Sequence, residues 1–389
     1  MKPMSRMMAP VALPTAAGPG PVMRNRTILP PMCQYSVDAC DGVPRNWQLV
    51  HLGARAAGGF GLVMAEATAV AAEGRISDRD TGLWNDAQRD AWKPIVQFIQ
   101  AEGALAGIQI AHAGGKASTY AWHESEADAG LVGTIPLDQG GWQTLGPSDT
   151  DALGLVPPRE MSLEQIDTSI QSWVHATRRA HEAGFDVLQI HAAHGYLIHE
   201  FLSPLTNHRS DRYGGPFENR VRYAIEVIRA VRTEWPEGKP LGIRLSGEDW
   251  NGDAGWQLAD TIRFAQEAHC LGVTLFDISS AGIGRYQGPF GPGYQVPLAA
   301  AVKEALRDTN AFVTAVGMVT EAAQAEQILV TGQADGVNIG RAALCQPNWP
   351  VAAAVTLGEP DRMLPQARQY WQANWQGRPK RGANTLTQD

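Results

Sequence analysis

Eight short apolar runs alternate with longer amphipathic stretches along nearly all of this 389-residue chain. Glycine or proline stands at many of their ends, and the runs occupy residues 26–30, 60–66, 106–112, 185–191, 240–246, 272–279, 311–317 and 334–340. Continuous apolar runs of this length are typical of strands that are buried on both faces of a parallel sheet. The alternation therefore restricts the chain to an α/β fold.

Helix signals lie between the runs. The spacing of apolar residues predicts helices over 45–57, 86–102, 162–182, 217–235, 256–270, 296–307 and 320–331. Ser162 and Gln165 form a capping-box pattern, and Thr320 marks another expected helix start. Because no Gly-x-Gly-x-x-Gly turn follows an early strand, a doubly wound open sheet is disfavoured. We expect a (β/α)8 TIM barrel that forms a single domain over 1–389.

Three segments fall outside the barrel pattern. Residues 1–23 carry an early Lys and Arg, but Pro and Gly interrupt the apolar stretch that a signal peptide requires, so a flexible lead-in is expected. Residues 117–160 are too long for an ordinary connection and predict a loop or lid after the third strand. Residues 360–389 form a C-terminal tail that ends in polar sequence.

Composition excludes several classes of partner. The formal net charge of −8 and the pI near 5.7 argue against nucleic acid or an anionic membrane surface. No run of about 18 apolar residues is present, so no membrane span is expected. The four cysteines, Cys33, Cys40, Cys270 and Cys345, have no C-x-x-C or zinc-like spacing, which predicts reduced thiols in the cytoplasm.

Polar residues gather where the expected strands end, which is the catalytic face of such barrels. They are Cys33, Tyr35, Glu66, Gln109, His112, His191, His194, Tyr196 and Arg244. After the last two strands, Gly317 and Gly340 allow close backbone approach and Arg341 opens a helix. Backbone amides and a guanidinium bind phosphate well. This end of the barrel is therefore expected to hold a nucleotide-like cofactor or a phosphorylated substrate.

The stretch "HAAHGYLIHEFLSP" (191–204) allows several interpretations. His191 and His194 could ligate zinc together with His199 or Glu200, as in a metal-dependent lyase or hydrolase. They could instead act as a base, polarise a substrate oxygen or satisfy the core. The residue types leave these alternatives open.

Several motifs together resemble the Old Yellow Enzyme family, and most closely its bacterial branch of flavin-dependent ene-reductases, which includes the xenobiotic reductases and thermophilic-like members. The motifs are "PMCQYS" (31–36), "EATAV" (66–70), "GIQIAHAGGKAS" (107–118), "HAAHGYLIHEFLSPLTNHRSDRYGG" (191–215) and "ADGVNIGRA" (334–342). The resemblance covers about 24–350 and implies an enzyme with non-covalent FMN and with NADPH or NADH as hydride source. No metal is then needed.

The resemblance also implies a role for each cofactor contact. Gln109 would hydrogen-bond the polar edge of the flavin, and Arg244 would lie beside its N1 and C2 oxygen, where a cation favours the reduced form. The further contacts implied are Pro31, Met32, Cys33 and Ala67 at the ring, and Gly317, Gly340 and Arg341 at the phosphate.

For the substrate, the resemblance implies activated alkenes, meaning α,β-unsaturated carbonyl compounds. His191 and His194 would donate N–H bonds to the carbonyl oxygen, Tyr35 would reach the same oxygen, and Tyr196 would deliver a proton to the α-carbon. Because both half-reactions would share one pocket, ping-pong kinetics are expected.

The chain departs from the family pattern in places. Gly115 stands where many members have an arginine, and Pro30 where many have a small residue. A homo-oligomer is expected, and Trp371 and Trp375 lie where relatives send a C-terminal side chain toward an active site. A catalytically idle flavin-binding sensor would not require Tyr196. Relatives with iron–sulfur and dinucleotide domains are excluded by the length of the chain and its four scattered cysteines.

Overall fold

The computed structural model describes residues 4–122, 128–150, 152–360, 364–370 and 372–373 of the chain. Eight parallel strands close into a barrel in which each strand pairs with the next in the series and the last pairs with the first. They are β3 (Thr27–Leu29), β4 (Leu62–Ala69), β5 (Leu105–Ala111), β8 (Val187–Ala192), β9 (Leu241–Ser246), β10 (Leu275–Ser279), β11 (Phe312–Ala315) and β12 (Gly336–Asn338). Each overlaps a predicted run, so the predicted (β/α)8 TIM barrel is confirmed.

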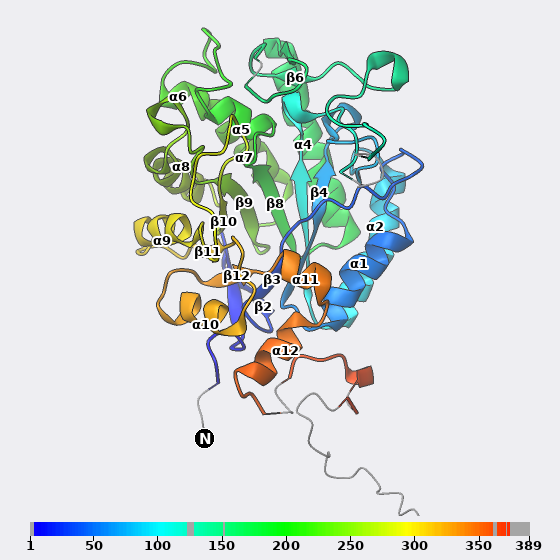
Figure 1. Ribbon diagram of the computed structural model, residues 1–389, viewed down its shortest axis with the longest axis vertical. Helices are drawn as coiled ribbons and strands as arrows, with labels where there is room; N and C mark the ends of the chain where they lie inside the picture. The colour runs from blue at the N-terminus through cyan, green and yellow to red at the C-terminus, as the bar shows by residue number, and fades with distance from the viewer. Residues whose placement is uncertain (1–3, 123–127, 151, 361–363, 371, 374–389) are drawn as a thin grey trace, which may run out of the picture.

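Helices surround the barrel and cover the outer faces of its strands (Figure 1). They include α1 (Asn46–Ala57), α2 (Asp86–Ala101), α4 (Leu163–Ala183), α5 (Leu197–Leu202), α6 (Phe217–Arg220), α7 (Arg222–Glu234), α8 (Leu258–Cys270), α9 (Val296–Ala305), α10 (Ala322–Val330), α11 (Arg341–Cys345) and α12 (Trp349–Thr356). The helix predicted over 217–235 is divided, because Val221 ends α6 and caps the start of α7.

The sequence signals for helix starts have different outcomes. Ser162 caps α4 as predicted: its Oγ accepts the Gln165 amide at 3.2 Å, and the Gln165 side chain accepts the Ser162 amide at 3.0 Å. At α10 the capping residue is Glu321 instead of Thr320, and the Thr320 amide donates to the Gln324 side chain. Local capping patterns therefore locate a helix start to within about one residue here.

The N-terminal lead-in was predicted to be flexible, and the described part of it corrects that prediction. β1 (Val11–Thr15) and β2 (Gly18–Met23) form an antiparallel hairpin. Leu13 and Met23 are fully buried and join an apolar cluster with Ile28, Leu62, Met64, Val187, Leu275 and Phe312 at the amino ends of the barrel strands. The hairpin is stabilised because its buried apolar residues cover the amino-terminal end of the barrel. The Pro and Gly residues of the segment, on which the prediction of flexibility rested, carry no information about this tertiary contact.

The segment over 117–160 follows β5 and contains the short strands β6 (Leu145–Gly146) and β7 (Arg159–Glu160). Figure 1 shows β6 beyond the carboxyl ends of the barrel strands. The segment therefore extends over the face that carries the polar residues. Trp371 and Trp375 of the tail lie outside the described residues.

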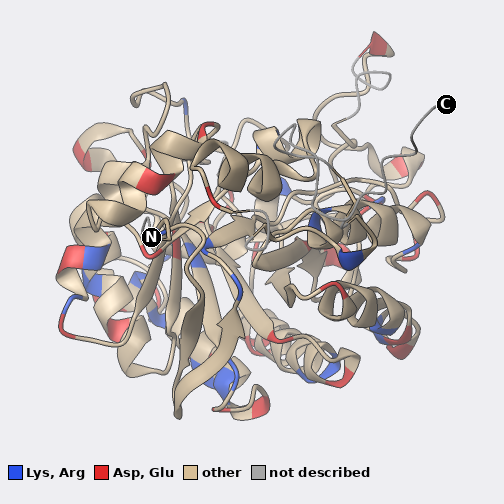
Figure 2. Ribbon diagram, turned by 90° about the horizontal axis from the view of Figure 1, so that it is seen from below, with Lys and Arg blue, Asp and Glu red and all other residues tan. Residues whose placement is uncertain are grey.

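Charged residues of both signs are interspersed over the outer helices (Figure 2). Within the described parts of the chain, no helix is long and apolar enough to cross a bilayer.

We predict that Leu13→Ala lowers the free energy of unfolding by about 2–5 kcal/mol, because it leaves a cavity at the closed end of the barrel. The change is measured by urea denaturation. Val22→Ala in the same hairpin is the control, since Val22 is 62% exposed and Leu13 is 0% exposed. Equal effects of the two substitutions would contradict a packing role for the hairpin.

Candidate functional site

Three side chains at the end of β8 face one another at the carboxyl end of the barrel: His191 lies in the strand, and His194 and Tyr196 lie in the turn after it. The ring centroids of His191 and His194 lie 5.3 Å apart, and those of His191 and Tyr196 lie 4.9 Å apart, both edge to face. His194 and Gly195 have positive φ angles of 62° and 74°, which turn the chain sharply before α5. The turn brings the two imidazoles and the phenol to one place.

Both imidazoles are neutral donors. Burial, followed by the charge of Arg244, holds the pKa values of His191 and His194 well below their usual range. The Ala193 amide donates to His191 Nδ1 at 3.3 Å, so the proton of that ring lies on Nε2. His194 Nε2 lies 2.8 Å from Ser279 Oγ. A pair of neutral N–H groups can bind a substrate oxygen without adding charge to the site.

Hydroxyl and thiol groups in the same region stay protonated. Burial, followed by the proximity of Cys33 and Asp80, raises the pKa of Tyr196 well above its usual value. Burial also raises the pKa values of the Cys33 thiol and the Tyr35 phenol. Cys33 is therefore a poor nucleophile, since the thiolate is the reactive form. Tyr196, in contrast, keeps the proton that a general acid must deliver.

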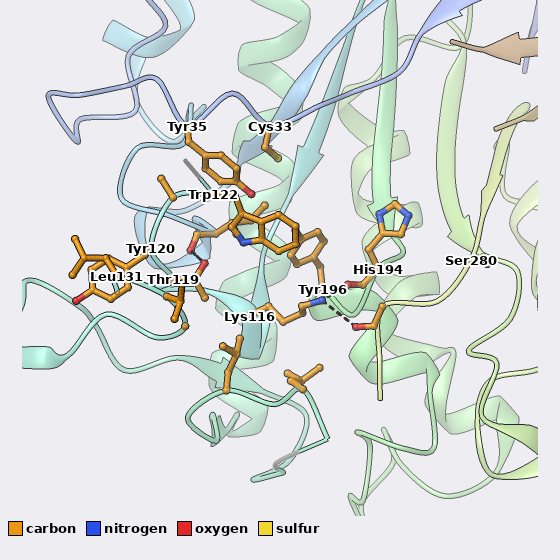
Figure 3. A pocket seen from close by; sticks show the side chains of 17 residues that line it. Cys33, Tyr35, Lys116, Thr119, Tyr120, Trp122, Leu131, His194, Tyr196 and Ser280 are labelled. Atoms are coloured by element: carbon orange, nitrogen blue, oxygen red, sulfur yellow. Dashed lines mark hydrogen bonds between the residues drawn. The ribbon is translucent and has the colours of Figure 1, made fainter. Parts of the chain in front are cut away.

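These groups open into one cavity of about 1130 Å³, in which Cys33, Tyr35, His194 and Tyr196 face the same space (Figure 3). Sequence reasoning missed other residues that line it, namely Ile76, Lys116, Thr119, Leu131, Leu153, Leu155 and Ser280. Lys116 stands within one of the family motifs, so a signal existed for it. The loop leucines gave none, because only the path of the segment over 117–160 brings them to the cavity.

Four residues predicted to contact the flavin ring or the substrate pair across neighbouring strands. Ala67 of β4 and Gln109 of β5 are register partners, and so are His191 of β8 and Arg244 of β9. Gln109 Nε2 donates to Gln189 Oε1 at 2.7 Å. The structure therefore brings the predicted amide, guanidinium and imidazole to neighbouring positions in the barrel.

A buried polar network below these positions was not predicted. Arg244 Nε lies 3.2 Å from Asp277 Oδ2, and Asp277 Oδ1 accepts from Asn338 Nδ2 at 3.0 Å and from Thr314 Oγ1 at 3.3 Å. Burial raises the pKa of Asp277, and Arg244 opposes that shift. The contact with Asp277 therefore fixes the position of the Arg244 guanidinium.

Glycines follow β11 and β12 at the positions where the sequence predicts a phosphate site. Gly317 has φ of 119°, and a Cβ built there would lie 3.2 Å from Gln295, so a larger residue would crowd the site. Gly340 caps α11, and Arg341 is exposed at its first position. A Cβ on Gly340 would lie 3.7 Å from Met32 Sδ, so the loop after β3 borders the same space.

Unpartnered polar atoms indicate that this region suits a bound cofactor. Among the described residues, the buried atoms Ser280 Oγ and Gln295 Oε1 of this region have no hydrogen-bond partner. Such atoms are costly unless a ligand or water satisfies them. A flavin phosphate and ring edge supply both donors and acceptors, so the residues present fit FMN.

The structure does not favour zinc at the histidine cluster. His199 Nδ1 accepts the Gly195 amide at 2.9 Å, and its Nε2 lies 3.0 Å from Asp249 Oδ1. Glu200 accepts the Gly115 amide at 2.7 Å. Both candidate third ligands are therefore directed elsewhere, and the described residues contain no group of three or more metal-ligating side chains.

Gly115 replaces the arginine of the family pattern, and the structure shows what fills its place. A Cβ on Gly115 would lie 2.7 Å from Leu153 Cδ1 and 3.0 Å from Pro158 Cγ. The segment over 117–160 therefore packs directly onto the turn after β5. His112 only supports this turn, since its Nδ1 accepts the Gly114 amide at 3.1 Å.

Comparison with known proteins identifies the family. Residues 14–359 match the model of the NADH:flavin oxidoreductase / NADH oxidase family. The chain belongs to this family, which is the Old Yellow Enzyme family of the predicted resemblance. It is an NAD(P)H-dependent flavin oxidoreductase with FMN as its flavin.

Curated relatives agree with this family. An NADPH dehydrogenase of Geobacillus sp. (strain WCH70) is 42% identical over 341 residues, which are 87% of this chain and 92% of the relative. An NADPH dehydrogenase of Listeria innocua serovar 6a is 41% identical over 349 residues, with coverage of 90% and 96%.

Solved structures show the same barrel. Morphinone reductase superposes with a TM-score of 0.74 at 25% identity, over 92% of this chain and 91% of its own. A 2-naphthoyl-CoA reductase complex gives a TM-score of 0.77 at 25% identity, over 92% of this chain but only 53% of its own. This Old Yellow Enzyme chain therefore shares its barrel with reductases, including one that is considerably longer.

In this Old Yellow Enzyme barrel, Glu66 lies at an irregularity in β4 and contacts the loop after β3 that carries Cys33. Its Oε2 accepts the Gln34 amide at 2.7 Å, and its Oε1 accepts from Gln48 Nε2 at 3.2 Å. Burial raises the pKa of Glu66 from 4.5 to about 7, although both hydrogen bonds oppose the shift. The carboxyl thus changes charge near neutral pH.

We predict that the unfolding free energy of the wild type falls relative to Glu66→Gln by up to about 3 kcal/mol as pH rises from 4.5 to 7. The sign follows because the folded pKa exceeds the unfolded one, so deprotonation costs the folded state more. Urea denaturation at several pH values measures the difference. Exposed Glu237→Gln is the control, and parallel pH profiles for wild type and Glu66→Gln would refute the shift.

Proposed function

We propose that this flavin oxidoreductase is an ene-reductase, which reduces the C=C bond of α,β-unsaturated carbonyl compounds. The observation that carries the proposal is a neutral imidazole and a protonated phenol, of His194 and Tyr196, that line one cavity, with the neutral imidazole of His191 packed against both rings. Such a set can bind a carbonyl oxygen and provide a proton. A metal-dependent lyase or hydrolase, the alternative, would require a third ligand that His199 and Glu200 do not offer.

His191 and His194 bind the substrate oxygen in this proposal. Negative charge develops on that oxygen when a hydride adds to the β-carbon, so N–H donors aimed at it stabilise the transition state more than the ground state. Neutral imidazoles suit this role because both keep an N–H donor. Tyr35 faces the same cavity and contributes a further hydroxyl.

Tyr196 delivers the proton to the α-carbon. Its phenol lies beside His191 and remains protonated because burial raises its pKa. The α-carbon gains a bond to that proton as the β-carbon gains a bond to hydride, and solvent then restores the phenol. The balance of the reaction is one hydride and one proton per alkene.

FMN, when bound and reduced, supplies the hydride. We propose that Gln109 and Arg244 hold the polar edge of its ring, with Pro31, Met32, Cys33 and Ala67 alongside. Gly317, Gly340 and Arg341 bind its phosphate. Asp277 supports the Arg244 guanidinium through the contact at 3.2 Å.

One cavity serves both half-reactions. NADPH or NADH donates to the flavin and must leave before the alkene enters, so the kinetics are ping-pong. The cavity of about 1130 Å³ admits substrates well beyond a single ring. This size agrees with the polycyclic compounds that name morphinone reductase and 2-naphthoyl-CoA reductase.

Location and assembly belong to the same proposal. All four cysteines are free and three of them are exposed, which suits the reducing cytoplasm. We propose a homo-oligomer, with no membrane or nucleic-acid partner. Size-exclusion chromatography with light scattering measures the assembly directly.

An anaerobic visible spectrum tests the function. We expect a flavin spectrum that bleaches on addition of NADPH and returns on addition of 2-cyclohexenone. Return of the spectrum with oxygen but not with the enone would reject the ene-reductase proposal and keep the flavin oxidoreductase. The proposal would equally fail if the wild-type protein reduced no activated alkene of any ring size.

We predict that Tyr196→Phe slows alkene reduction by about 10²- to 10⁴-fold and leaves reduction of the flavin by NADPH unchanged, because only the alkene step needs the proton. Stopped-flow measurement of the two half-reactions separates them. Tyr120→Phe is the control, since Tyr120 borders the same cavity but its hydroxyl donates to Gln139 at 2.9 Å. Full turnover in Tyr196→Phe would assign the proton to water or another acid.

A further inference from the structure

His194 holds an uncommon backbone conformation. Its φ of 62° lies in the left-handed region, which costs a non-glycine residue free energy unless its surroundings enforce it. The conformation sets the direction in which the imidazole leaves the chain. Groups that stabilise this backbone therefore control where the Nε2 atom lies.

The backbone of His194 is held at both ends of the residue. Its amide donates to Ser246 Oγ at 2.9 Å. Its carbonyl oxygen accepts from Lys116 Nζ at 2.8 Å, and its ring Nε2 lies 2.8 Å from Ser279 Oγ. Of these contacts, the one from Lys116 comes from a cationic side chain, and hydrogen bonds to charged groups are the stronger kind.

Lys116 also connects the neighbouring loop. Its Nζ donates to Gly282 O at 3.0 Å, and Gly282 packs so closely that a Cβ there would lie 2.1 Å from the carbonyl carbon of His194. One ammonium group thus joins the turn after β5 to the loops after β8 and β10. The two acceptor loops carry His194 on one side and the unpartnered Ser280 hydroxyl on the other.

The ammonium lies beside the proton donor as well. Lys116 Nζ is 5.5 Å from the centre of the Tyr196 ring, and both residues line the cavity (Figure 3). A cation at this distance from an aromatic face is attracted to it. Lys116 therefore contacts the backbone of the oxygen-binding histidine and the ring of the proton donor at once.

We propose that Lys116 is a positioning residue. It holds the His194 carbonyl and the Tyr196 ring in the positions from which the imidazole N–H and the phenol reach the same substrate. This inference rests on the proposed function, in which both groups act on one activated alkene. Lys116 itself touches no reacting atom. Its loss relaxes the left-handed turn and moves the imidazole away from the oxygen.

The test compares Lys116→Met with Lys239→Met in the FMN-loaded protein. Lys239 is a matched control: its Nζ donates to Phe185 O at 2.7 Å and lies 5.1 Å from the Trp235 ring, but it does not line the cavity. Both substitutions remove one lysine that binds a carbonyl and an aromatic face. A general loss of stability should then appear in both.

The first readout is the dissociation constant of 4-hydroxybenzaldehyde, a non-alkene carbonyl ligand, from the change in flavin absorbance. We expect Lys116→Met to weaken binding by about tenfold or more, the effect of one hydrogen bond to a charged group, and Lys239→Met to leave it unchanged. If Lys116→Met does not fold, Lys116→Gln replaces it, because it removes the charge but keeps a polar amide. Its dissociation constant for the ligand is then compared with that of Lys239→Met.

The second readout is turnover of 2-cyclohexenone by the same preparations. Lys116→Met should raise KM and lower kcat for the enone, whereas the melting temperatures of the two lysine variants should fall by similar amounts. Unchanged ligand binding in Lys116→Met and in Lys116→Gln would overturn the positioning role. Failure of the wild type to reduce the enone would count against the proposed function, while the ligand-binding comparison would still decide the role of Lys116.

Discussion

Closure of the parallel strand ladder is the constraint on which the rest of this structure depends. Pairing of β12 with β3 completes the barrel, so all eight carboxyl ends meet at one rim. Residues far apart in the sequence, such as Cys33 and Ser280, then line one cavity. The hairpin of β1 and β2 closes the opposite end with apolar side chains, which leaves the rim as the open side.

Burial at this rim determines the chemistry of its polar groups. The low dielectric keeps the imidazoles of His191 and His194 neutral and the Tyr196 phenol protonated. The same residue types at an exposed surface would titrate near their usual values. The groups that the proposed reaction requires, neutral imidazoles and a protonated phenol, therefore arise from ordinary side chains, because the barrel removes them from water.

Much of the fold could be predicted from the sequence because its signals are local. Continuous apolar runs located all eight strands, and the capping box of Ser162 located the start of α4. The hairpin at the N-terminus escaped prediction, because its stability comes from contacts of Leu13 with distant strands. The packing of Leu153 against Gly115 was not predicted either, because it depends on the path of a long loop.

The sequence by itself determined the barrel, the family and the residue types at the strand ends. The apolar runs, the Gly and Pro residues at their ends and the family motifs are all properties of residues that are adjacent in the chain. Only the tertiary structure decided how those residues act. It placed Lys116 on the carbonyl of His194, directed His199 toward Asp249, and set Asp277 beneath Arg244. These contacts join segments that are far apart in the sequence, and they depend on how the chain folds, which no local pattern encodes.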